Sequence, residues 1–350
     1  MKDVLVVVCT PDLRRESARR CIESVRATDL GRAELLVVDN AFDPAFHHAA
    51  TMEQIRVLAG DRPVVFLDDD VEIDTPDWLA RLFATRDATD ALVVGCRHRS
   101  PGGEPNHVGA LVFEDGSTEI LCERPAAAGP GPFVPAVSSA VVLLPEPSRV
   151  AFDLRFAKYQ HDLDLGMQAW RQGRRVACCD ELEVVHVMGG YAMSRPEVFN
   201  RFWPDAFAFR DKWAAFAAGG LYDRPELAGF AASARGTNWL VLYNHASSVQ
   251  RSDPDAARRA FWRIARECPT PERAAGAYFH LYEIDGDPVC LEACLEREPA
   301  HRKARELLEL HRREDTQCAT SRPSSSRSES PLGATSSPPP SSGWARSPST

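Results

Sequence analysis

The chain has no apolar run long enough to cross a membrane. No stretch of its 350 residues approaches the roughly 20 consecutive apolar residues that a transmembrane helix needs. The start, Met1-Lys2-Asp3, is followed by a short apolar segment without the small-residue cleavage site of a signal peptide. We therefore predict a protein without a transmembrane segment that works in the cytoplasm.

Cysteine pairs are also absent. The sequence contains 10 cysteines, but none of them forms a Cys-x-x-Cys pair. Several lie in apolar surroundings, where an unpaired cysteine packs as a small hydrophobic residue. This pattern argues against a disulfide framework and against a zinc cluster, and it fits a reducing compartment.

An excess of basic charge is missing as well. The formal net charge is −9, whereas binding to nucleic acid needs clustered Lys and Arg against the phosphate backbone. Neither a Walker A motif nor a Gly-x-Gly-x-x-Gly pattern follows the first apolar segment. Ser138-Ser139 lacks the Gly-x-Ser-x-Gly surroundings of a hydrolase nucleophile. We expect neither a nucleic-acid partner nor a nucleophilic serine.

The chain does contain a regular alternation of short apolar segments and helix-compatible segments. With 44% hydrophobic and 26% charged residues, its composition is that of a globular protein. The expected order is strand 4–8, helix 14–27, strand 34–38, helix 47–59, strand 64–67, a helix opened by Pro76, and strand 91–95. This alternation alone predicts a parallel sheet covered by helices.

After residue 96 the pattern is less regular. The expected elements are a hairpin of 107–113 and 117–122, a strand at 133–144, a helix from 159 to 172 stopped by Gly173, strands at 174–177 and 182–187, and a helix at 195–216. Phe and Trp recur at near-helical spacing in the last helix, and we expect them to pack in the core.

Asp68-Asp69-Asp70 directly follows a continuous apolar run, residues 64–67. Such a run is typical of a buried strand, and open α/β sheets bind ligands outside the carboxyl ends of their strands. Adjacent carboxylates repel one another, so a cation stabilises them, and hard oxygen ligands suit Mg²⁺ or Mn²⁺. The triplet therefore predicts a metal site, with a solvated acidic turn as the alternative.

The C-terminal part differs in composition. Residues 259–281 and 291–311 resemble each other, and each segment predicts two helices joined by a Pro-containing turn. The pattern resembles tetratricopeptide hairpins, with a plain helical bundle as the alternative. We expect this region to dock on the rest of the chain or to offer a surface for a protein partner or for self-association. Residues 316–350, rich in Ser, Pro and Arg, predict a disordered tail.

Taken in order, the segments resemble the family-2 glycosyltransferases of the GT-A fold. The resemblance covers residues 3–215 and depends on the order and spacing of the motifs rather than on any one of them. The matching pieces are Val6-Val7-Val8-Cys9-Thr10, Leu36-Val37-Val38-Asp39-Asn40, Phe66-Leu67-Asp68-Asp69-Asp70, Phe152-Asp153-Leu154-Arg155-Phe156, His161-Asp162-Leu163-Asp164-Leu165 and Val184-Val185-His186.

The resemblance implies both an architecture and an activity. Residues 1–215 would form a GT-A domain, a Rossmann-like mixed sheet flanked by helices. A connecting segment, 216–252, would join it to the helical region at 253–315. The activity would be metal-dependent transfer of a sugar, with inversion, from a nucleoside-diphosphate sugar to a hydroxyl-bearing acceptor. That acceptor is a saccharide, a lipid-linked molecule, a protein or a small molecule.

Five residues are candidates for the metal site and for catalysis. In the resembling family the last Asp of the acidic element binds the metal, and the earlier ones contact ribose or water. We expect Asp68 and Asp70 to hold Mn²⁺ or Mg²⁺, and Asp68 and Asp69 to contact the nucleotide. His186 is a third candidate ligand, since neutral imidazole suits Mn²⁺, with a structural histidine as the alternative. Asp162 aligns with the catalytic base of the family.

Four further residues are candidates for nucleotide contact. Asp39 and Asn40 end a neighbouring strand, where the resemblance supports contact with the base and an Asx turn is the alternative. Thr10 and Arg14 lie at the first strand-to-helix turn, although Arg14 also fits a solvated helix residue. The alternative role for Asp162 is helix capping, which suits Asp164 better.

The chain departs from the family pattern in three places. His161 stands where the family usually has Glu, residues 45–61 lack the usual Gly-rich segment and carry His47-His48, and Ser138-Ser139 replaces a Gly. Two alternative functions therefore stay open. One is an inactive GT-A-like scaffold that works through its helical region, which His161 favours. The other is a nucleotidyltransferase, which would need a Gly-rich loop after the first strand.

Overall fold

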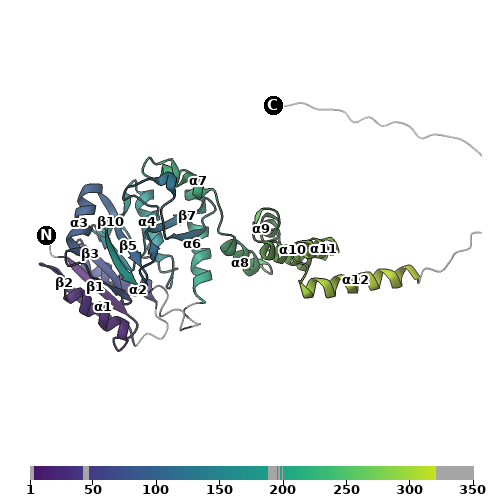
Figure 1. Cartoon of the computed structure of the whole chain (residues 1–350), viewed down its shortest axis with the longest axis horizontal. Coiled ribbons are helices and arrows are strands. Elements are labelled where there is room, and N and C mark those ends of the chain that lie inside the picture. The colour runs from purple at the N-terminus through teal and green to yellow at the C-terminus, as the bar shows by residue number, and fades with distance from the viewer. Residues whose placement is uncertain (1–3, 42–46, 188–194, 196–197, 199, 321–350) are drawn as a thin grey trace, which may run out of the picture.

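The structure, a computed structural model, describes residues 4–41, 47–187, 195, 198 and 200–320 (Figure 1). The first part of the chain contains the elements β1 (Leu5–Thr10), α1 (Glu16–Arg26), β2 (Glu34–Asp39), α2 (His48–Ala59), β3 (Val64–Asp68), β4 (Val71–Glu72), α3 (Trp78–Thr89), β5 (Ala91–Arg99), β6 (Pro105–His107), β7 (Gly109–Val112), β8 (Thr118–Leu121), β9 (Val141–Leu144), α4 (His161–Arg171), β10 (Arg175–His186) and α6 (Phe202–Ala218). The second part contains α7 (Ala231–Ala234), α8 (Trp239–Val249), α9 (Pro254–Glu267), α10 (Pro271–Asp285), α11 (Pro288–Arg297) and α12 (Arg302–Thr320).

The central sheet is mixed. Its strand order is β2-β1-β3-β9-β5-β10-β4, and β6 pairs with β5. Strands β2, β1 and β3 run parallel, as do β5 and β10. Strand β9 is antiparallel to β3 and β5, and β4 is antiparallel to β10. The predicted class, a mixed sheet flanked by helices with a C-terminal all-helical region, is confirmed.

Three expectations about the strands are wrong. The alternation alone predicts a purely parallel sheet, but β9 enters between β3 and β5 without a crossover helix and is therefore antiparallel. Of the strand expected at 133–144, only Val141–Leu144 belongs to β9. The two strands expected at 174–177 and 182–187 form one strand, β10, because its register with β5 shifts between Cys179 and Glu183 rather than ending there.

The sheet is buried on both faces, as a strand with continuous apolar residues predicts. Side chains alternate along β1: Val6 and Val8 belong to the core that includes α1 and α3, whereas Val7 and Cys9 belong to the core that includes α2, α4 and α6. Figure 1 shows these helices on the two sides of the sheet. The helix expected at 195–216 is α6, which begins at Phe202. Its Phe209 packs in the core, as expected.

Helix α4 lies close to the chain segment that precedes β9. A Cβ on Gly166 would lie 3.0 Å from the Pro135 carbonyl oxygen and 3.1 Å from Ala136 Cα. Gly173, with a φ of +72°, follows the end of α4, where we expected it to stop the helix. The close approach at Gly166 brings the start of α4 near the residues just before β9.

Helices α8 to α12 form two adjoining cores. Phe261 of α9 packs with α8 and α10, and Phe279 of α10 packs with α11 and α12. Helices α9 and α10, followed by α11 and α12, are the two expected helical hairpins, while the tetratricopeptide likeness stays a prediction. Arg263 of α9 donates to Thr237 Oγ1 at 2.6 Å and pairs with Asp115 at 3.7 Å, which ties the hairpins to the first part of the chain.

The predicted boundaries at 215, 252 and 315 stay predictions. Within the expected connecting segment, Leu221 and Phe230 pack in a core of the sheet, whereas α8 packs with α9. Helix α12 reaches Thr320 and so overlaps the start of the expected tail, and residues 321–350 lie outside the described residues.

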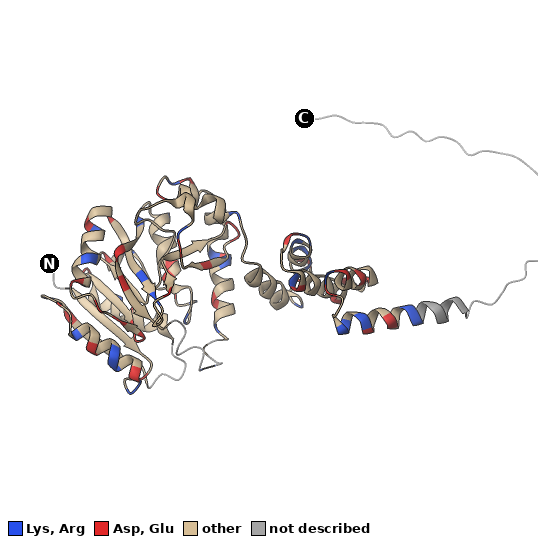
Figure 2. Cartoon of the chain, viewed as in Figure 1, with Lys and Arg blue, Asp and Glu red and all other residues tan. Residues whose placement is uncertain are grey.

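Figure 2 shows charges of both signs on α1 and α12. Across the described residues, no helix is both long enough and apolar enough to span a bilayer.

Candidate functional site

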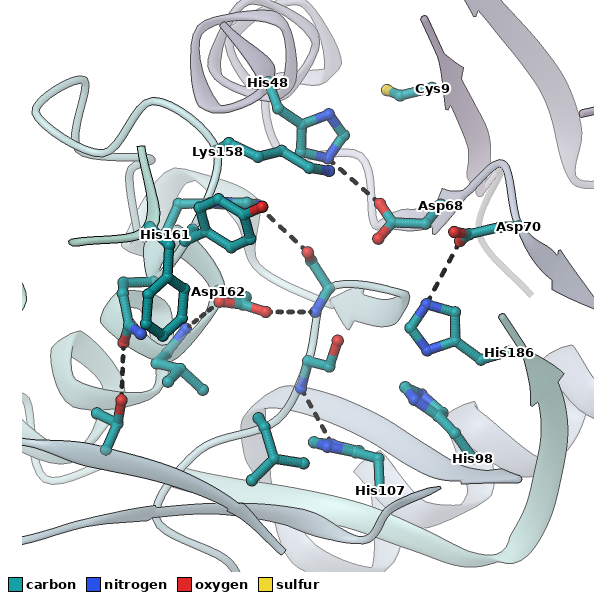
Figure 3. Close-up of a pocket in the computed structure, with 18 of the residues that line it drawn as sticks. Cys9, His48, Asp68, Asp70, His98, His107, Lys158, His161, Asp162 and His186 are labelled. Carbon is teal, nitrogen blue, oxygen red and sulfur yellow. Dashed lines mark hydrogen bonds and ion pairs between the residues drawn. The ribbon is translucent and has the colours of Figure 1, made fainter. Parts of the chain in front are cut away.

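A pocket of about 410 Å³ lies at the carboxyl ends of the sheet strands. Its lining comes from many elements, and the charged or polar lining residues include Asp68, Asp69, Asp70 and Asp162, the histidines 48, 98, 107, 161 and 186, Lys158, Ser138 and Ser139 (Figure 3). Four of the predicted site aspartates and His186 are therefore in one cavity, although they lie far apart in the sequence.

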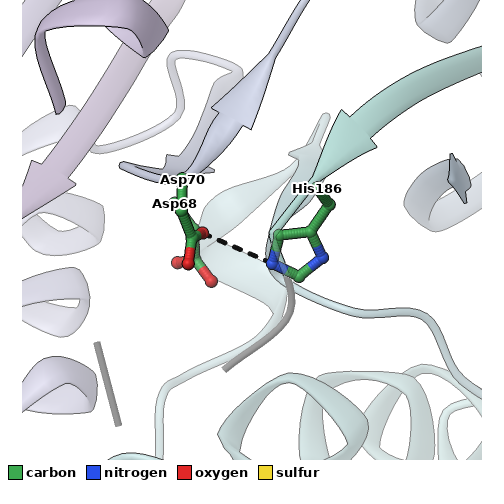
Figure 4. A group of neighbouring side chains, drawn as sticks. All are labelled: Asp68, Asp70 and His186. Atoms are coloured by element: carbon green, nitrogen blue, oxygen red, sulfur yellow. Dashed lines mark ion pairs between the residues drawn. The ribbon is translucent and has the colours of Figure 1, made fainter. Parts of the chain in front are cut away.

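Strand pairing brings Asp70 to His186. Asp68 ends β3, and after Asp69 and Asp70 the chain enters β4, which pairs antiparallel with the end of β10 so that Val71 lies opposite His186. One oxygen of Asp70 is 3.3 Å from His186 Nε2. Ligand atoms of Asp68, Asp70 and His186 all lie within 4.8 Å of one another (Figure 4). Two carboxylate oxygens and one imidazole nitrogen at this spacing fit a divalent cation, with a donor set suited to Mn²⁺.

Asp69 is held differently from its two neighbours. Its Oδ2 accepts a hydrogen bond from Thr10 Oγ1 at 2.7 Å and pairs with Arg15 Nη1 at 2.5 Å. Burial raises the pKa of Asp69 to about 6, although the charge of Arg15 and the bond from Thr10 act in the opposite direction. Asp69 thus links the acidic turn to the β1–α1 loop.

Asp162 is anchored by backbone amides at the start of α4. Its Oδ2 accepts the N–H of Ser139 at 3.1 Å, and its Oδ1 accepts the N–H of Leu163 at 2.9 Å. Burial raises the pKa of Asp162, and the two amide bonds oppose this effect. The carboxylate therefore bonds to the first turn of the helix, as the capping alternative predicts, and it also lines the pocket, as a catalytic role requires.

A lysine approaches the acidic turn from the opposite side of the pocket. Lys158 is the only lysine or arginine among the described residues that line the pocket, and Figure 3 shows it beside His48, whose Nε2 is 3.3 Å from Asp68 Oδ1. Burial opposes ionisation of Asp68, but the positive charge of Lys158 and the contact with His48 lower its pKa below the usual range. Asp68 is accordingly an ionised carboxylate in the pocket.

The loop that carries Lys158 is fixed by a buried carboxylate from α6. Asp205 is 3% exposed and accepts the backbone N–H groups of Ala157, Lys158 and Tyr159 at 3.1, 2.9 and 2.8 Å. Tyr159 in turn packs edge to face on Phe202, with ring centroids 5.3 Å apart. Residues 157–159 thus have a defined path along the pocket.

The four other candidate nucleotide residues do not line the pocket. Thr10 is fully buried, and its hydroxyl bonds to Asp69. Arg14 is 86% exposed at its side chain and pairs with Asp12. Asp39 is exposed, and it lies opposite Thr10 where β1 pairs with β2. Its side chain accepts the N–H of Ala41, which is the Asx turn that the alternative interpretation expects.

Asn40 and Asp164 have structural partners. Asn40 donates from Nδ2 to Thr51 Oγ1 at 2.9 Å. The expectation that Asp164 caps α4 is wrong, because this fully buried carboxylate accepts from Trp213 Nε1 at 2.6 Å and from Gln168 Nε2 at 2.7 Å, and it pairs with Lys212. These contacts join α4 to α6 rather than satisfying the helix start.

Sequence reasoning missed Lys158, His98 and His107. One available signal is the scarcity of lysine, since the sequence contains only Lys2, Lys158, Lys212 and Lys303. The histidines gave no comparable signal, because strand pairing rather than sequence spacing gathers them. His161, which stands where the resembling family usually has Glu, points at Ser139, with Nε2 3.3 Å from Oγ.

No protein-family model matches the chain. The O-antigen biosynthesis protein RfbC of Myxococcus xanthus is 25% identical over 272 residues, which are 71% of this chain and 20% of that protein. The chain thus spans one fifth of the length of this curated relative.

Solved structures that match most of the chain have low identity. TarS residues 1–349 of S. aureus is 11% identical with a TM-score of 0.43, covering 89% of this chain and 92% of that one. The mannosyltransferase PcManGT of Pyrobaculum calidifontis, in complex with GDP-Man and Mn²⁺, is 16% identical with a TM-score of 0.42, covering 85% and 88%. Because both TM-scores are below 0.5, we draw no conclusion about function from these two likenesses.

Proposed function

We propose that this chain is a glycosyltransferase of the family-2, GT-A type that moves a sugar from a nucleoside-diphosphate sugar to a hydroxyl-bearing acceptor, with inversion. One observation carries the proposal. The carboxylates that end β3 and a separate carboxylate at the start of α4 line the same pocket, with a lysine beside them. The first group suits a cation and a diphosphate, and the second suits a proton acceptor.

Asp68, Asp70 and His186 would hold a divalent metal, Mn²⁺ or Mg²⁺. Their ligand atoms lie within 4.8 Å of one another, and one oxygen of Asp70 is 3.3 Å from His186 Nε2. The metal, when bound, neutralises charge on the leaving diphosphate. The imidazole nitrogen in this set favours Mn²⁺ over Mg²⁺, which prefers oxygen ligands.

Lys158 would supply the second positive charge for the diphosphate. Departure of the sugar places charge on the leaving phosphate oxygens, and a fixed cation aimed at that position stabilises the transition state more than the ground state. The charge of the ammonium group lowers the pKa of Asp68, which supports a role for Lys158 in this part of the pocket. Because Asp205 fixes its loop, Lys158 is held in place before the donor binds.

Asp162 would take the proton from the acceptor hydroxyl as general base. A general base serves this step best when its pKa lies near the working pH. Burial raises the pKa of Asp162 in that direction. Hydrogen bonds from the amides of Ser139 and Leu163 orient the carboxylate. Attack by an acceptor activated at Asp162, while the diphosphate leaves from the Asp70 side, inverts the anomeric configuration.

Asp39 and Asn40 would contact the nucleoside part of the donor. Asp39 ends β2 and Asn40 follows it. Since β1 pairs with both β2 and β3, and Asp68 ends β3, all of these residues lie at the carboxyl ends of neighbouring strands. Thr10 would act through Asp69 by the hydrogen bond between them. Arg14 would reach the nucleotide only by leaving its ion pair with Asp12.

The acceptor class is supported by the curated relative alone. RfbC is described as an O-antigen biosynthesis protein, and transferring this description to the chain favours a saccharide acceptor over a protein or a small molecule. The C-terminal hairpins, α9 to α12, would offer a surface for a protein partner or for self-association. We further propose that the enzyme works in the cytoplasm, where nucleoside-diphosphate sugars would reach it.

A thermal-shift screen tests the proposal. The four common nucleoside diphosphates, UDP, GDP, ADP and dTDP, are added with and without Mn²⁺ or Mg²⁺, because a ligand that binds only the folded state raises the melting temperature. We expect one of them to stabilise the protein, and to do so only with metal. Asp70→Ala should remove the shift, whereas Asp87→Ala, an exposed carboxylate on α3, should retain it. A chain that none of the diphosphates stabilises would contradict the proposal, as the scaffold alternative expects.

A further inference from the structure

Three histidines form a row across three neighbouring strands. His186 ends β10, His98 lies on β5 and His107 ends β6, and β5 pairs with both of the other strands. His98 stacks on His107 with ring centroids 4.6 Å apart, and it meets His186 edge to face at 5.2 Å. All three side chains line the pocket, where Figure 3 labels them.

All three rings have at least one ring nitrogen without a hydrogen-bond partner among the described residues, which is Nδ1 in the case of His186. Neither nitrogen of His98 makes a hydrogen bond, although the side chain is only 1% exposed. His107 accepts the backbone N–H of Ser138 at Nε2, 3.2 Å away, so its proton is on Nδ1, and Nδ1 has no partner. A buried polar group without a partner costs free energy, which a bound molecule with matching groups recovers.

His98 and His107 suit a ligand group that is not charged. His107 must be neutral to accept an N–H at Nε2, and His98, buried against it, is not in a position that favours a charge. A neutral imidazole presents one donor and one acceptor, and a hydroxyl group offers the same pair. His98 and His107 therefore match alcohol groups better than phosphate oxygens.

The row also lies where the transferred sugar has to be. At one end His186 pairs with Asp70, on the side of the diphosphate. At the other end Ser138 and Ser139 give consecutive backbone N–H groups, the first to His107 and the second to Asp162. During transfer the reacting carbon lies between the diphosphate and the acceptor oxygen at Asp162. The sugar ring attached to that carbon is therefore beside His98 and His107.

We propose that His98 and His107 bind hydroxyl groups of the donor's sugar ring and so select which sugar is transferred. The proposal depends on the proposed function, since it assigns the sugar subsite of the same pocket. A site built to bond a substrate hydroxyl rejects the analogue that lacks it, because its own buried groups are then left unpaired. The competing occupant is ordered water, which would satisfy the same nitrogens without any selection.

Calorimetry with paired ligands tests this assignment. UDP, GDP, ADP and dTDP are each titrated with Mn²⁺ beside UDP-glucose, GDP-mannose, ADP-glucose and dTDP-glucose, first into the wild-type chain and then into His98→Phe. Phenylalanine keeps an aromatic ring that stacks on His107, but it removes both nitrogens. We expect the variant to bind the free diphosphate as the wild type does, and to bind the nucleotide sugar about tenfold more weakly. His245→Phe, on α8 outside the pocket lining, should leave both affinities unchanged.

Donors that lack one ring hydroxyl complete a double-mutant cycle. In the wild type, the donor that lacks the recognised hydroxyl should bind about tenfold more weakly than its parent. In His98→Phe, the parent and the deoxy donor should bind with nearly equal affinity. His98→Gln, which restores a donor and an acceptor, should recover part of the loss. If His98→Phe does not fold, His107→Phe and the deoxy series on the wild type provide the same comparison.

The outcomes separate the two proposals. Equal affinity of wild type and His98→Phe for the nucleotide sugar, or additive effects of the variant and every deoxy donor, would overturn the sugar subsite and leave the water interpretation. An equal loss for the free diphosphate and the nucleotide sugar would overturn it too, because the histidine would then only support the pocket. A wild-type chain that binds no nucleoside diphosphate would instead contradict the proposed function itself.

Discussion

The carboxylate of Asp205 accepts the backbone N–H of Lys158 at 2.9 Å, and it accepts the amides on both sides of that residue as well. A side chain of α6 therefore fixes the loop that carries the only lysine among the described pocket-lining residues. The aspartate does not line the pocket itself. Its contribution to the chemistry is the position that it gives to another residue.

Replacement of Asp205 by Asn should loosen this loop. The amide keeps one acceptor oxygen but brings an N–H₂ group towards three backbone donors, and loss of hydrogen bonds to a charged group costs about 1.5–3 kcal/mol. We expect a melting temperature several degrees lower and a raised KM for the donor. Asp211→Asn, an exposed change on the same helix, is the control. Wild-type melting and KM in Asp205→Asn would show that the loop does not depend on this carboxylate.

Replacement of Lys158 by Met should reduce transfer far more than stability. Methionine keeps the apolar stem, so the pocket wall remains, but no cation faces the leaving diphosphate, and loss of one such stabilising group costs about 10²–10³ in kcat. The readout is kcat and KM with saturating Mn²⁺, compared with Lys303→Met on α12. A kcat equal to that of the wild type would remove Lys158 from the mechanism.

Asp162 should control the pH dependence of transfer. The base works only when ionised, and burial raises its pKa above the ordinary value for Asp, about 3.9. The value of kcat/KM should therefore fall as the pH falls through this raised pKa and be full above it. Asp162→Asn should lower transfer by about 10²–10⁴-fold and abolish this acidic limb, while nucleotide binding remains. If Asp162→Asn transfers sugar normally, the residue only caps α4.

Gly166 should be intolerant of larger side chains. Any Cβ there would press on Pro135 and Ala136, whose chain continues to Ser138 and Ser139, and overpacking of this kind costs about 1–3 kcal/mol. We expect Gly166→Val to lower both the melting temperature and transfer, because α4 and Asp162 move away from Ser139. Gly102→Ala, where the three atoms nearest to a Cβ belong to the flexible Glu104 side chain, should change neither. Full activity in Gly166→Val would mean that α4 accommodates the valine without moving Asp162.

The acidic turn could be predicted because its signal is local. A continuous apolar run indicates a buried strand, and Asp68 and Asp70 follow it at once, so their place at the sheet edge needs no knowledge of the rest of the fold. Asp162 needed the family resemblance, since an aspartate at a helix start is equally typical of a cap. In the structure, Asp162 bonds to the first turn of α4 and also lines the pocket, so a local pattern could not separate the two roles.

Other features depend on contacts between distant segments. The antiparallel entry of β9 follows from the loops and the hairpin that precede it, and its own residues, Val141–Leu144, would suit either direction. His98, His107 and His186 meet only because β5 pairs with both β6 and β10. Asp205 resembled any acidic residue on an amphipathic helix, and its role became visible only with the 157–159 loop packed against it.

The central claim is that Asp70 and its neighbours support metal-dependent transfer from a nucleotide sugar. The most direct measurement is release of nucleoside diphosphate from the donor that the thermal-shift screen identifies, in the presence of Mn²⁺, for the wild type, Asp70→Ala and Asp87→Ala. We predict release by the wild type and by Asp87→Ala, and its loss in Asp70→Ala and after chelation of the metal. Undiminished release by Asp70→Ala, or by the wild type in excess chelator, would contradict the account.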